Sequence, residues 1–353
     1  MKKILGIMAK IVIVMVLIVI LFLGYRYKDL IRTVMSIKKL SGAPAYQAKI
    51  YGDFGLDEYL KVGAKSNGEL QDFCFRALKL EFLNPKAEKF DHGCSGFYAK
   101  TPDGDYILAI NYDTYPDQQL PVVIQTDAKC SNSSVDNTKC TTKVLGIANS
   151  GYFVKNKELT GIVDKISIGA SPYLCMDGMN EHGLGIGLAT AKGSSGVKAN
   201  DDRLVMVDFT ISTAVLNQAK DVEETIDYLS QITIPRSTHP SHFLIGDAKG
   251  NSAVIEWIDG EMQVIETNEP YQIFSNTVLY RATEIGCGRY RAYEEVLRGT
   301  EGVISEEDAL ELLKENTLGA HACFSVVYNL SKGTMKVTFH NDYENVYEIA
   351  GDF

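Results

Sequence analysis

Residues 93–113, GCSGFYAKTPDGDYILAINYD, are the stretch from which the fold of this chain is predicted. Cys94–Lys100 and Tyr106–Tyr112 have the pattern of two β-strands, and the sequence PDGD between them is typical of a tight turn. The two strands are therefore expected to pair as an antiparallel hairpin. In such a hairpin the second strand returns beside the first and can present Asp113 next to Cys94.

The segments around this hairpin predict both helices and strands. Asp221 is a typical N-cap for a helix over Val222–Gln231, and Ser305 with Asp308 forms a capping pattern for a helix over Ser305–Asn316. The other expected helices are Gln71–Leu83, which Asn84-Pro85 would end, Leu204–Gln218 and Arg289–Arg298. Further strands are expected at Leu120–Gln125, Lys143–Ile147, Leu184–Ala189, His242–Ile245, Ala253–Trp257, Met262–Thr267, Gln272–Ser275, Ala322–Leu330, Thr334–His340 and Val346–Ile349. Groups of strands, then helices, then strands predict a layered α+β fold with largely antiparallel sheets.

The N-terminal residues predict a membrane segment. Ile11–Tyr25 contains no charged residue, and the span reaches the roughly 20 residues of a transmembrane helix if it extends back through Ile4–Ala9 with Lys10 at the interface. A cleaved signal peptide is the alternative, but it would have small residues directly after the apolar run, where this chain has Arg26 and Lys28. We therefore expect an uncleaved, single-pass anchor.

This anchor leads to a three-part organisation. Residues 1–27 would form the anchor, residues 28–93 a stalk and pro-segment, and residues 94–353 the main domain. Positive charges flank both ends of the apolar run, so the positive-inside rule does not decide the topology. Cys130 and Cys140 flank a polar loop and form either a disulfide or two free thiols. A disulfide would favour a body outside the cytoplasm.

The composition bounds the expected partners. The hydrophobic fraction of 45% is that of a globular protein with a substantial core. The net charge is −10 and no Lys/Arg patch stands out in the body of the chain, so nucleic acid is not an expected partner. None of the seven cysteines belongs to a C-x-x-C pair, so a structural zinc site has no support.

Cys94 stands where its own α-amino group could activate it. A thiol nucleophile requires a base or a lowered pKa, and none of the six histidines lies in a papain-like or caspase-like signature. A free α-amino group, with a pKa of about 7.7–8.0, suits proton transfer near neutral pH. This solution requires cleavage after Gly93, a small and permissive residue, and an acidic group such as Asp113 to orient the amine.

Several motifs, taken in order along the chain, resemble those of one known family. They are Gly93-Cys94-Ser95, Thr101-x-Asp103-Gly104, Ile110–Asp113, Asn180–Leu184, HFLIG at 242–246, AVIEW at 253–257, Phe274-Ser275-Asn276 and Gly288-Arg289-Tyr290. Together they resemble the choloylglycine hydrolase and linear amide C–N hydrolase family, which includes penicillin V acylase, bile salt hydrolases, acid ceramidase and N-acylethanolamine acid amidase. The likeness extends from about Cys94 to the C-terminus.

The resemblance implies a four-layer αββα sandwich of the N-terminal-nucleophile hydrolases, without a metal or organic cofactor. Cys94 would be the nucleophile, and Asp113, at the family's spacing of 113 − 94 = 19 residues, would bind its amine and thiol. Asn276 would donate to the oxyanion of the tetrahedral intermediate, and Arg289 would lie near the nucleophile. Each has a simpler interpretation: a buried small hydrophobe for Cys94, turn residues for Asp113 and Asn276, and a helix-surface residue for Arg289.

Other assignments carried by the resemblance are less direct. The backbone N–H of Tyr112 would be a second oxyanion donor, and Asn180 and Thr190 would contact the substrate, although Asn180 also fits a simple turn. Ile110 stands where many members have an arginine, and bile salt hydrolases carry an asparagine near the position of Thr190, so a bile-salt specialist is not expected. The long segment before Cys94 is more similar to the ceramidase-type arrangement, in which a pro-segment is cut off and stays bound.

The expected reaction is hydrolysis of a linear, non-peptide amide bond in a small-molecule N-acyl amide, through a thioester on Cys94. An acyltransferase remains an alternative, because a second amine could replace water at the same acyl-enzyme. A non-catalytic, membrane-tethered binding domain on the same fold is the other alternative, and Ile110 is the feature in its favour.

Overall fold

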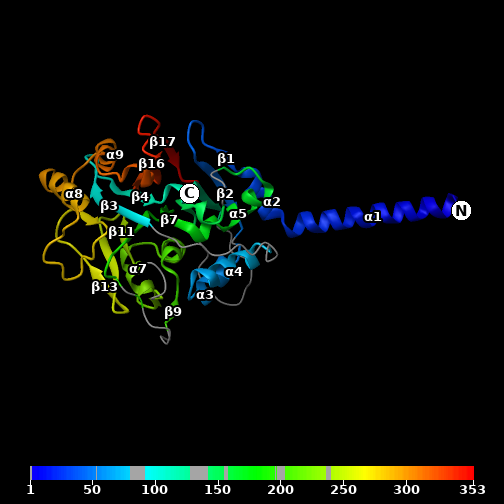
Figure 1. Cartoon of the computed structure of the whole chain (residues 1–353), viewed down its shortest axis with the longest axis horizontal. Coiled ribbons are helices and arrows are strands. Elements are labelled where there is room, and N and C mark those ends of the chain that lie inside the picture. The colour runs from blue at the N-terminus through cyan, green and yellow to red at the C-terminus, as the bar shows by residue number, and fades with distance from the viewer. Residues whose placement is uncertain are drawn as a thin grey trace.

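The computed structural model describes residues 2–52, 54–79, 92–127, 142–154, 158–194, 196, 203–235 and 240–353. Within these residues, two β-sheets pack against each other and helices cover both outer faces (Figure 1). The body is therefore a mixed α/β fold with the expected αββα layers, and one long helix projects from it (Figure 1).

The smaller sheet has six strands and is antiparallel throughout. Its order is β14 (Gln272–Phe274), β3 (His92–Lys100), β4 (Tyr106–Thr114), β15 (Ala322–Asn329), β16 (Thr334–Phe339) and β17 (Tyr347–Ala350). β3 and β4 are the predicted hairpin, which turns through Gly104 at φ 94°, a conformation that glycine adopts without strain.

The larger sheet has nine strands, and only its β2–β5 pair is parallel. Its order is β1 (Lys38–Lys39), β2 (Tyr46–Tyr51), β5 (Pro121–Asp127), β6 (Val144–Asn149), β7 (Cys175–Asn180), β8 (Leu184–Thr190), β11 (Ser241–Asp247), β12 (Ser252–Ile258) and β13 (Glu261–Ile265). A separate parallel pair joins β9 (Leu204–Val205) to β10 (Ile232–Thr233).

Helices cover the two sheets from outside. α8 (Gly288–Gly299) and α9 (Glu306–Glu315) pack on the six-stranded sheet, whereas α6 (Ile211–Gln218) and α7 (Val222–Leu229) pack on the nine-stranded sheet. Two shorter helices, α2 (Lys28–Ser36) and α5 (Ile162–Ser167), lie near the base of the projecting helix (Figure 1). Two others, α3 (Leu56–Val62) and α4 (Asn67–Ala77), lie lower in the same view. The predicted caps are confirmed, because Asp221 Oδ1 accepts from the Glu224 N–H at 2.9 Å and Ser305 Oγ from the Asp308 N–H at 3.0 Å.

The hairpin presents a different neighbour to each of its faces. Phe97 and Ala99 of β3 pack outward against α8, where they meet Tyr293 and Leu297. Tyr98, which points to the opposite side because side chains alternate along a strand, belongs to the core between the sheets. One short stretch therefore contributes to both hydrophobic layers.

The two sheets approach closely where large side chains meet glycines. A Cβ on Gly187 of β8 would lie 2.5 Å from Ile110 Cδ1, and a Cβ on Gly246 of β11 would lie 2.3 Å from Tyr98 Cδ2. Ile110 is fully buried at this contact. The residue that departs from the family pattern is thus a core residue between the sheets.

Two expectations about local structure are corrected. The helix expected over Leu204–Gln218 begins only at Ile211, because Leu204 and Val205 pair with β10 instead. The helix expected over Gln71–Leu83 is α4, which begins earlier, at Asn67, where Ser66 Oγ accepts from the Glu69 N–H at 3.2 Å. α4 also ends earlier than expected, at Ala77, and not at the predicted stop. Asn84-Pro85 and the cysteines Cys130 and Cys140 lie outside the described residues.

Part of the segment expected as stalk and pro-segment, residues 28–93, packs on the body. Leu30 and Thr33 of α2 are buried against the body, and β2 pairs along its length with β5 in the nine-stranded sheet. The buried face of α2 and the pairing of β2 with β5 therefore make these two elements part of the body.

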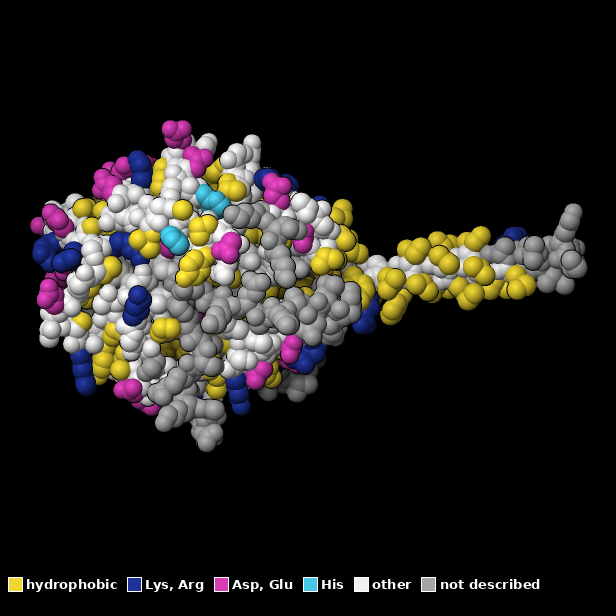
Figure 2. Space-filling view, in the orientation of Figure 1, with side chains coloured by type: hydrophobic (Ala, Val, Ile, Leu, Met, Phe, Trp, Pro, Cys, Tyr) yellow, Lys and Arg dark blue, Asp and Glu magenta, His cyan; other side chains and the backbone are white. Residues whose placement is uncertain are grey.

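The projecting helix is α1 (Lys2–Arg26), and its apolar side chains point to all sides (Figure 2). Every side chain from Ile11 to Leu23 is at least 45% exposed. Among the described residues no single helix is long and apolar enough to cross a membrane, whereas Lys10–Arg26 and Lys28–Ser36, bent by 68° at their junction, qualify together by length and composition.

Candidate active site

The predicted site assembles at the open end of the β3–β4 hairpin. In the register of this pair Cys94 stands opposite Tyr112 and Gly93 stands opposite Asp113. The hairpin therefore brings Asp113 beside the Gly93–Cys94 bond, as the sequence predicts.

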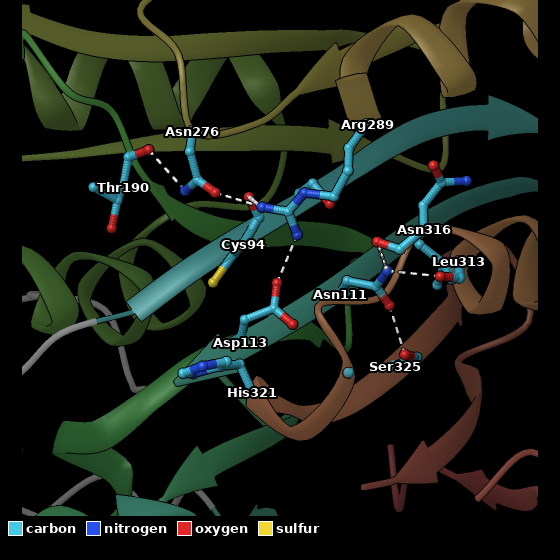
Figure 3. A network of polar contacts seen from close by, with 12 residues as sticks. Cys94, Asn111, Asp113, Thr190, Asn276, Arg289, Leu313, Asn316, His321 and Ser325 are labelled. Atoms are coloured by element: carbon cyan, nitrogen blue, oxygen red, sulfur yellow. Dashed lines mark hydrogen bonds and ion pairs between the residues drawn. The ribbon is translucent and has the colours of Figure 1, made fainter. Parts of the chain in front are cut away.

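Arg289, the second residue of α8, joins three of the predicted residues with one guanidinium group (Figure 3). Its Nη1 donates to Asp113 Oδ2 at 2.6 Å, in an ion pair that is almost fully buried. Its Nη2 donates to the backbone oxygen of Cys94 at 3.3 Å and to Asn276 Oδ1. A planar donor fork can satisfy several acceptors at fixed angles, so Arg289 sets the relative positions of all three residues.

Asn276 also lies close to the Gly93–Cys94 peptide bond. Its Nδ2 donates to the backbone oxygen of Thr190 at 3.0 Å, and a Cβ on Gly93 would lie 3.5 Å from its Oδ1. Because an amide nitrogen carries two hydrogens, one N–H of Asn276 remains beyond the bond to Thr190. The oxyanion role of Asn276 would use that hydrogen and stays a prediction.

A pocket of about 560 Å³ opens over this arrangement and is lined by Gly93, Asp113, Thr190 and Asn276. Six further lining residues were not predicted as site residues from the sequence: Thr114, Tyr115, Lys192, Pro240, Leu318 and His321. His321 packs edge-on against Tyr115, with ring centres 5.8 Å apart. No motif marks these six positions, because segments from distant parts of the chain bring them together.

Burial controls the charge of the two central groups. It raises the pKa of Asp113 to about 6, against the opposing charge and hydrogen bond of Arg289. It also raises the pKa of the fully buried Cys94 thiol well above its usual value, and the negative charge of Asp113 raises it further. The thiol of the uncut chain is therefore protonated at neutral pH and poorly nucleophilic.

Cys287, the residue before α8, has the opposite character. Its thiol is only half-buried. Burial acts to raise its pKa, but hydrogen bonds from Ser275 and from the backbone of Tyr290 and Arg289, with the Arg289 charge, outweigh burial and lower the pKa below its usual value. The more reactive described thiol of the uncut chain is thus Cys287.

The remaining predicted residues lie in three different environments. Thr190 lines the pocket. Tyr112 is fully buried, and its hydroxyl lies 2.8 Å from that of Tyr152. Its strand, β4, lies between β3 and β15. The oxyanion role of the Tyr112 backbone N–H stays a prediction. Asn180 is not among the described residues that line the pocket, and its substrate-binding role stays a prediction. Its amide donates to Leu216 O and Ala219 O and accepts from two backbone N–H groups, so it holds the β7–β8 turn.

A second polar network fixes the helices behind the hairpin (Figure 3). Asn111 Nδ2 donates to Leu313 O at 2.8 Å, and Asn111 Oδ1 accepts from Ser325 Oγ at 2.5 Å. The hydroxyls of Ser95 and Tyr293 lie 2.9 Å apart. These buried bonds tie α8 and α9 to β3 and β4, and so restrain the helix that carries Arg289.

The difference between the two thiols predicts their reactivity. In uncut chain, iodoacetamide at pH 7.5 should alkylate Cys287 at least about 10-fold faster than Cys94, because a thiolate is the reactive form. Mass spectrometry of the peptide that spans Gly93–Cys94 reports uncut chain alone, and the Cys287→Ser variant is the control. Equal alkylation of Cys94 and Cys287 in uncut chain would contradict this account of the buried thiol.

Comparisons with known proteins agree with this geometry. Curated protein sequences give no match to the chain. Among solved structures, a mutant of the conjugated bile acid hydrolase from Clostridium perfringens is 18% identical with a TM-score of 0.50, over 73% of this chain and 92% of that one. Penicillin V acylase from Agrobacterium tumefaciens is 17% identical with a TM-score of 0.51, over 73% of this chain and 86% of that one. At such identities these two structures establish a shared fold.

The family of linear amide C–N hydrolases, choloylglycine hydrolase family, matches residues 94–300, more than half of the chain. The match begins at Cys94 and includes Asp113, Asn276 and Arg289. The chain therefore belongs to the choloylglycine hydrolase family of N-terminal-nucleophile hydrolases, and it is a hydrolase of linear, non-peptide carbon–nitrogen bonds.

Proposed function

We propose that this enzyme hydrolyses a small-molecule N-acyl amide with Cys94 as an N-terminal nucleophile, after cleavage between Gly93 and Cys94. The observation that carries the proposal is the guanidinium of Arg289, which holds Asp113, the Cys94 carbonyl and Asn276 around that one bond at the wall of the pocket.

The surroundings of the bond support its cleavage. Oδ1 of Asp113 has no hydrogen-bond partner among the described residues, although its other oxygen is held by Arg289. A buried acceptor without a partner is costly, and an ammonium group on Cys94 would satisfy it. The family match also begins at Cys94. Both facts fit a mature domain whose first residue is this cysteine.

The reaction would then proceed in two steps. The Cys94 amine takes the thiol proton, directly or through a water, and the sulfur attacks the amide carbonyl carbon. Asn276 donates its remaining N–H to the oxygen, which carries the negative charge of the tetrahedral intermediate. Collapse breaks the C–N bond as the ammonium returns a proton to the leaving amine, and water then hydrolyses the thioester to release the acid.

Residues before the cleavage point would stay bound to the mature domain. β2 pairs with β5 in the nine-stranded sheet, and Leu56, Tyr59 and Leu70 of α3 and α4 are buried in the core. A chain cut after Gly93 should therefore remain one particle under native conditions, held by the same apolar contacts as before.

This proposal predicts the products of expression. Wild-type chain should give two fragments on a denaturing gel, and the larger one should begin Cys-Ser-Gly; in gel filtration the two should elute together. Cys94→Ala should remain one uncut chain. Cleavage of Cys94→Ser as fast as wild type would show that another protease cuts the bond, and wild-type chain that stays uncut and inactive on N-acyl amides would sink the proposal.

The raised pKa of Asp113 predicts an acidic limit to activity. The value of about 6 applies to the uncut chain, and an ammonium group on Cys94 would lower the pKa of Asp113 in the mature enzyme. The rate should therefore fall about tenfold per pH unit below a limit that lies no higher than about pH 6. Stability has the opposite sign: the folded state binds this proton more tightly than the unfolded chain does, so this group stabilises the fold at low pH and loses that contribution as pH rises through about 6.

Amine release between pH 4.5 and 8 from a panel of N-acyl amides, namely phenoxyacetyl, glycine-conjugated and N-acylethanolamine substrates, measures this limit, with thermal melts alongside. Asp113→Asn should lower the rate roughly 10²-fold or more and abolish the acidic limit. The assignment fails if Asp113→Asn retains the same acidic limit.

We also propose that α1 anchors the enzyme in a membrane as a single-pass segment, with the body outside the cytoplasm. The supporting observations are its length of 25 residues and the exposure of every side chain from Ile11 to Leu23, since water disfavours so large an apolar surface.

The anchor can be tested by charge. Full-length protein should stay in the membrane pellet after alkaline carbonate extraction, whereas Val14→Arg combined with Ile18→Arg should move most of it to the supernatant, because each arginine costs about 2.5–3.5 kcal/mol at the centre of a span. Ile162→Arg, on the exposed surface of the body, is the matched control. Protease added to intact cells should digest the body; an undigested body would reverse the proposed orientation.

A further inference from the structure

A buried histidine–glutamate pair lies behind Asn276. His242 of β11 and Glu256 of β12 stand directly opposite each other in the nine-stranded sheet. Neither side chain has any exposed surface, and His242 Nδ1 lies 2.9 Å from Glu256 Oε1. Charged or titratable groups are rarely buried so completely unless every hydrogen-bonding atom has a partner.

The other hydrogen bonds of this pair all go to one loop. His242 Nε2 lies 2.6 Å from the backbone oxygen of Ser275. Glu256 Oε1 accepts from the Leu279 N–H at 2.7 Å, and Oε2 accepts from the Tyr280 N–H at 2.9 Å. The loop from Ser275 to Tyr280 is thus held on both sides of Asn276.

The hydrogen-bond inventory fixes how the pair is protonated. A backbone carbonyl only accepts, so His242 Nε2 carries a hydrogen that it donates to Ser275. His242 Nδ1 and Glu256 Oε1 then share a proton between them, while both oxygens of Glu256 also receive backbone N–H groups. All four contacts are satisfied together, which gives the loop a single preferred position.

We propose that His242 and Glu256 are positioning residues for the reaction: they hold the 275–280 loop so that the remaining N–H of Asn276 faces the reacting carbonyl. Neither side chain is among the described residues that line the pocket, so the pair acts through Asn276. Arg289 and Thr190 hold the amide of Asn276, and the pair holds its backbone. An oxyanion donor displaced by about 1 Å costs on the order of 10² in rate.

The inference rests on the proposed oxyanion role of Asn276, but its first test does not. In the Cys94→Ala chain, which cannot use Cys94 for cleavage, hydrogen–deuterium exchange of the Leu279 and Tyr280 amides should accelerate about tenfold or more in His242→Phe. Glu256→Gln should accelerate exchange at Leu279 but not at Tyr280, because a glutamine that donates to His242 Nδ1 turns its NH2 group towards the Leu279 N–H while its carbonyl oxygen still accepts from Tyr280. Unchanged exchange in His242→Phe would overturn the positioning role, whatever Cys94 does.

Asp247→Asn is the matched control. Asp247 is a buried carboxylate at the opposite end of the same β11–β12 hairpin, and it also accepts backbone N–H groups, from Lys249 at 2.9 Å and Asn251 at 3.1 Å. It makes the same kind of bond far from the 275–280 loop along the strands. This substitution should leave exchange at Leu279 and Tyr280 unchanged.

The second test is kinetic and uses the N-acyl amide on which the full-length enzyme is most active. His242→Phe should lower kcat roughly 10- to 100-fold with KM changed less than threefold, because an oxyanion forms only after binding. Glu256→Gln should stay within about fivefold of wild type, and Asp247→Asn should leave kcat unchanged. The double variant His242→Phe with Asn276→Ala should be no slower than Asn276→Ala alone.

The outcomes separate the two hypotheses. If Asn276→Ala leaves kcat unchanged, the proposed oxyanion role fails, and the exchange measurement alone decides whether the pair positions the loop. If Asn276→Ala is slow and His242→Phe is as fast as wild type, only the present inference is overturned. An equal loss of kcat in Asp247→Asn would mean general destabilisation and would also overturn it.

Discussion

The site depends on one buried ion pair, between Arg289 at the start of α8 and Asp113 at the end of β4. A buried pair repays the loss of hydration only when its remaining hydrogen bonds are made. Here the guanidinium also donates to the Cys94 carbonyl and to Asn276, whereas one oxygen of Asp113 has no partner among the described residues. The structure thus leaves one unsatisfied acceptor beside the bond whose cleavage would supply a cation.

The same arrangement explains why an uncut chain would be inactive. The Cys94 thiol is fully buried, and both burial and the Asp113 charge keep it protonated. Its potential base is still an amide nitrogen bonded to Gly93. Cleavage would create an amine, open one side of the sulfur and occupy the free oxygen of Asp113 in one event. In this account the inactivity of the precursor and the mechanism of the mature enzyme have one physical cause.

The side chains of the site are held in place by residues that lie outside the pocket. The side chain of Asn276 is held by Arg289 and the Thr190 carbonyl, and its backbone is held by the loop that His242 and Glu256 restrain. α8 is in turn tied to the hairpin through Ser95 and Tyr293. Ile110, which departs from the family pattern, fills the space over Gly187 between the sheets and is not among the described residues that line the pocket.

Much of this could be read from the sequence because the information is local. Alternation in residues 94–100 and 106–112 predicts the hairpin, capping residues predict the starts of α7 and α9, and the order of the motifs identifies the family. Other features depend on contacts between distant segments. Val205 is a strand residue only because Thr233 pairs with it, and β2 is part of the large sheet only because β5 lies beside it. Asn180 holds a turn because two backbone carbonyls accept hydrogen bonds from its amide. The sequence by itself determined the hairpin and placed the candidate nucleophile Cys94 beside its acidic neighbour. Only the tertiary structure decided the pocket wall of His321 and Lys192, the pair behind Asn276 and the raised pKa of Asp113, because burial and long-range contacts exist only in the folded chain.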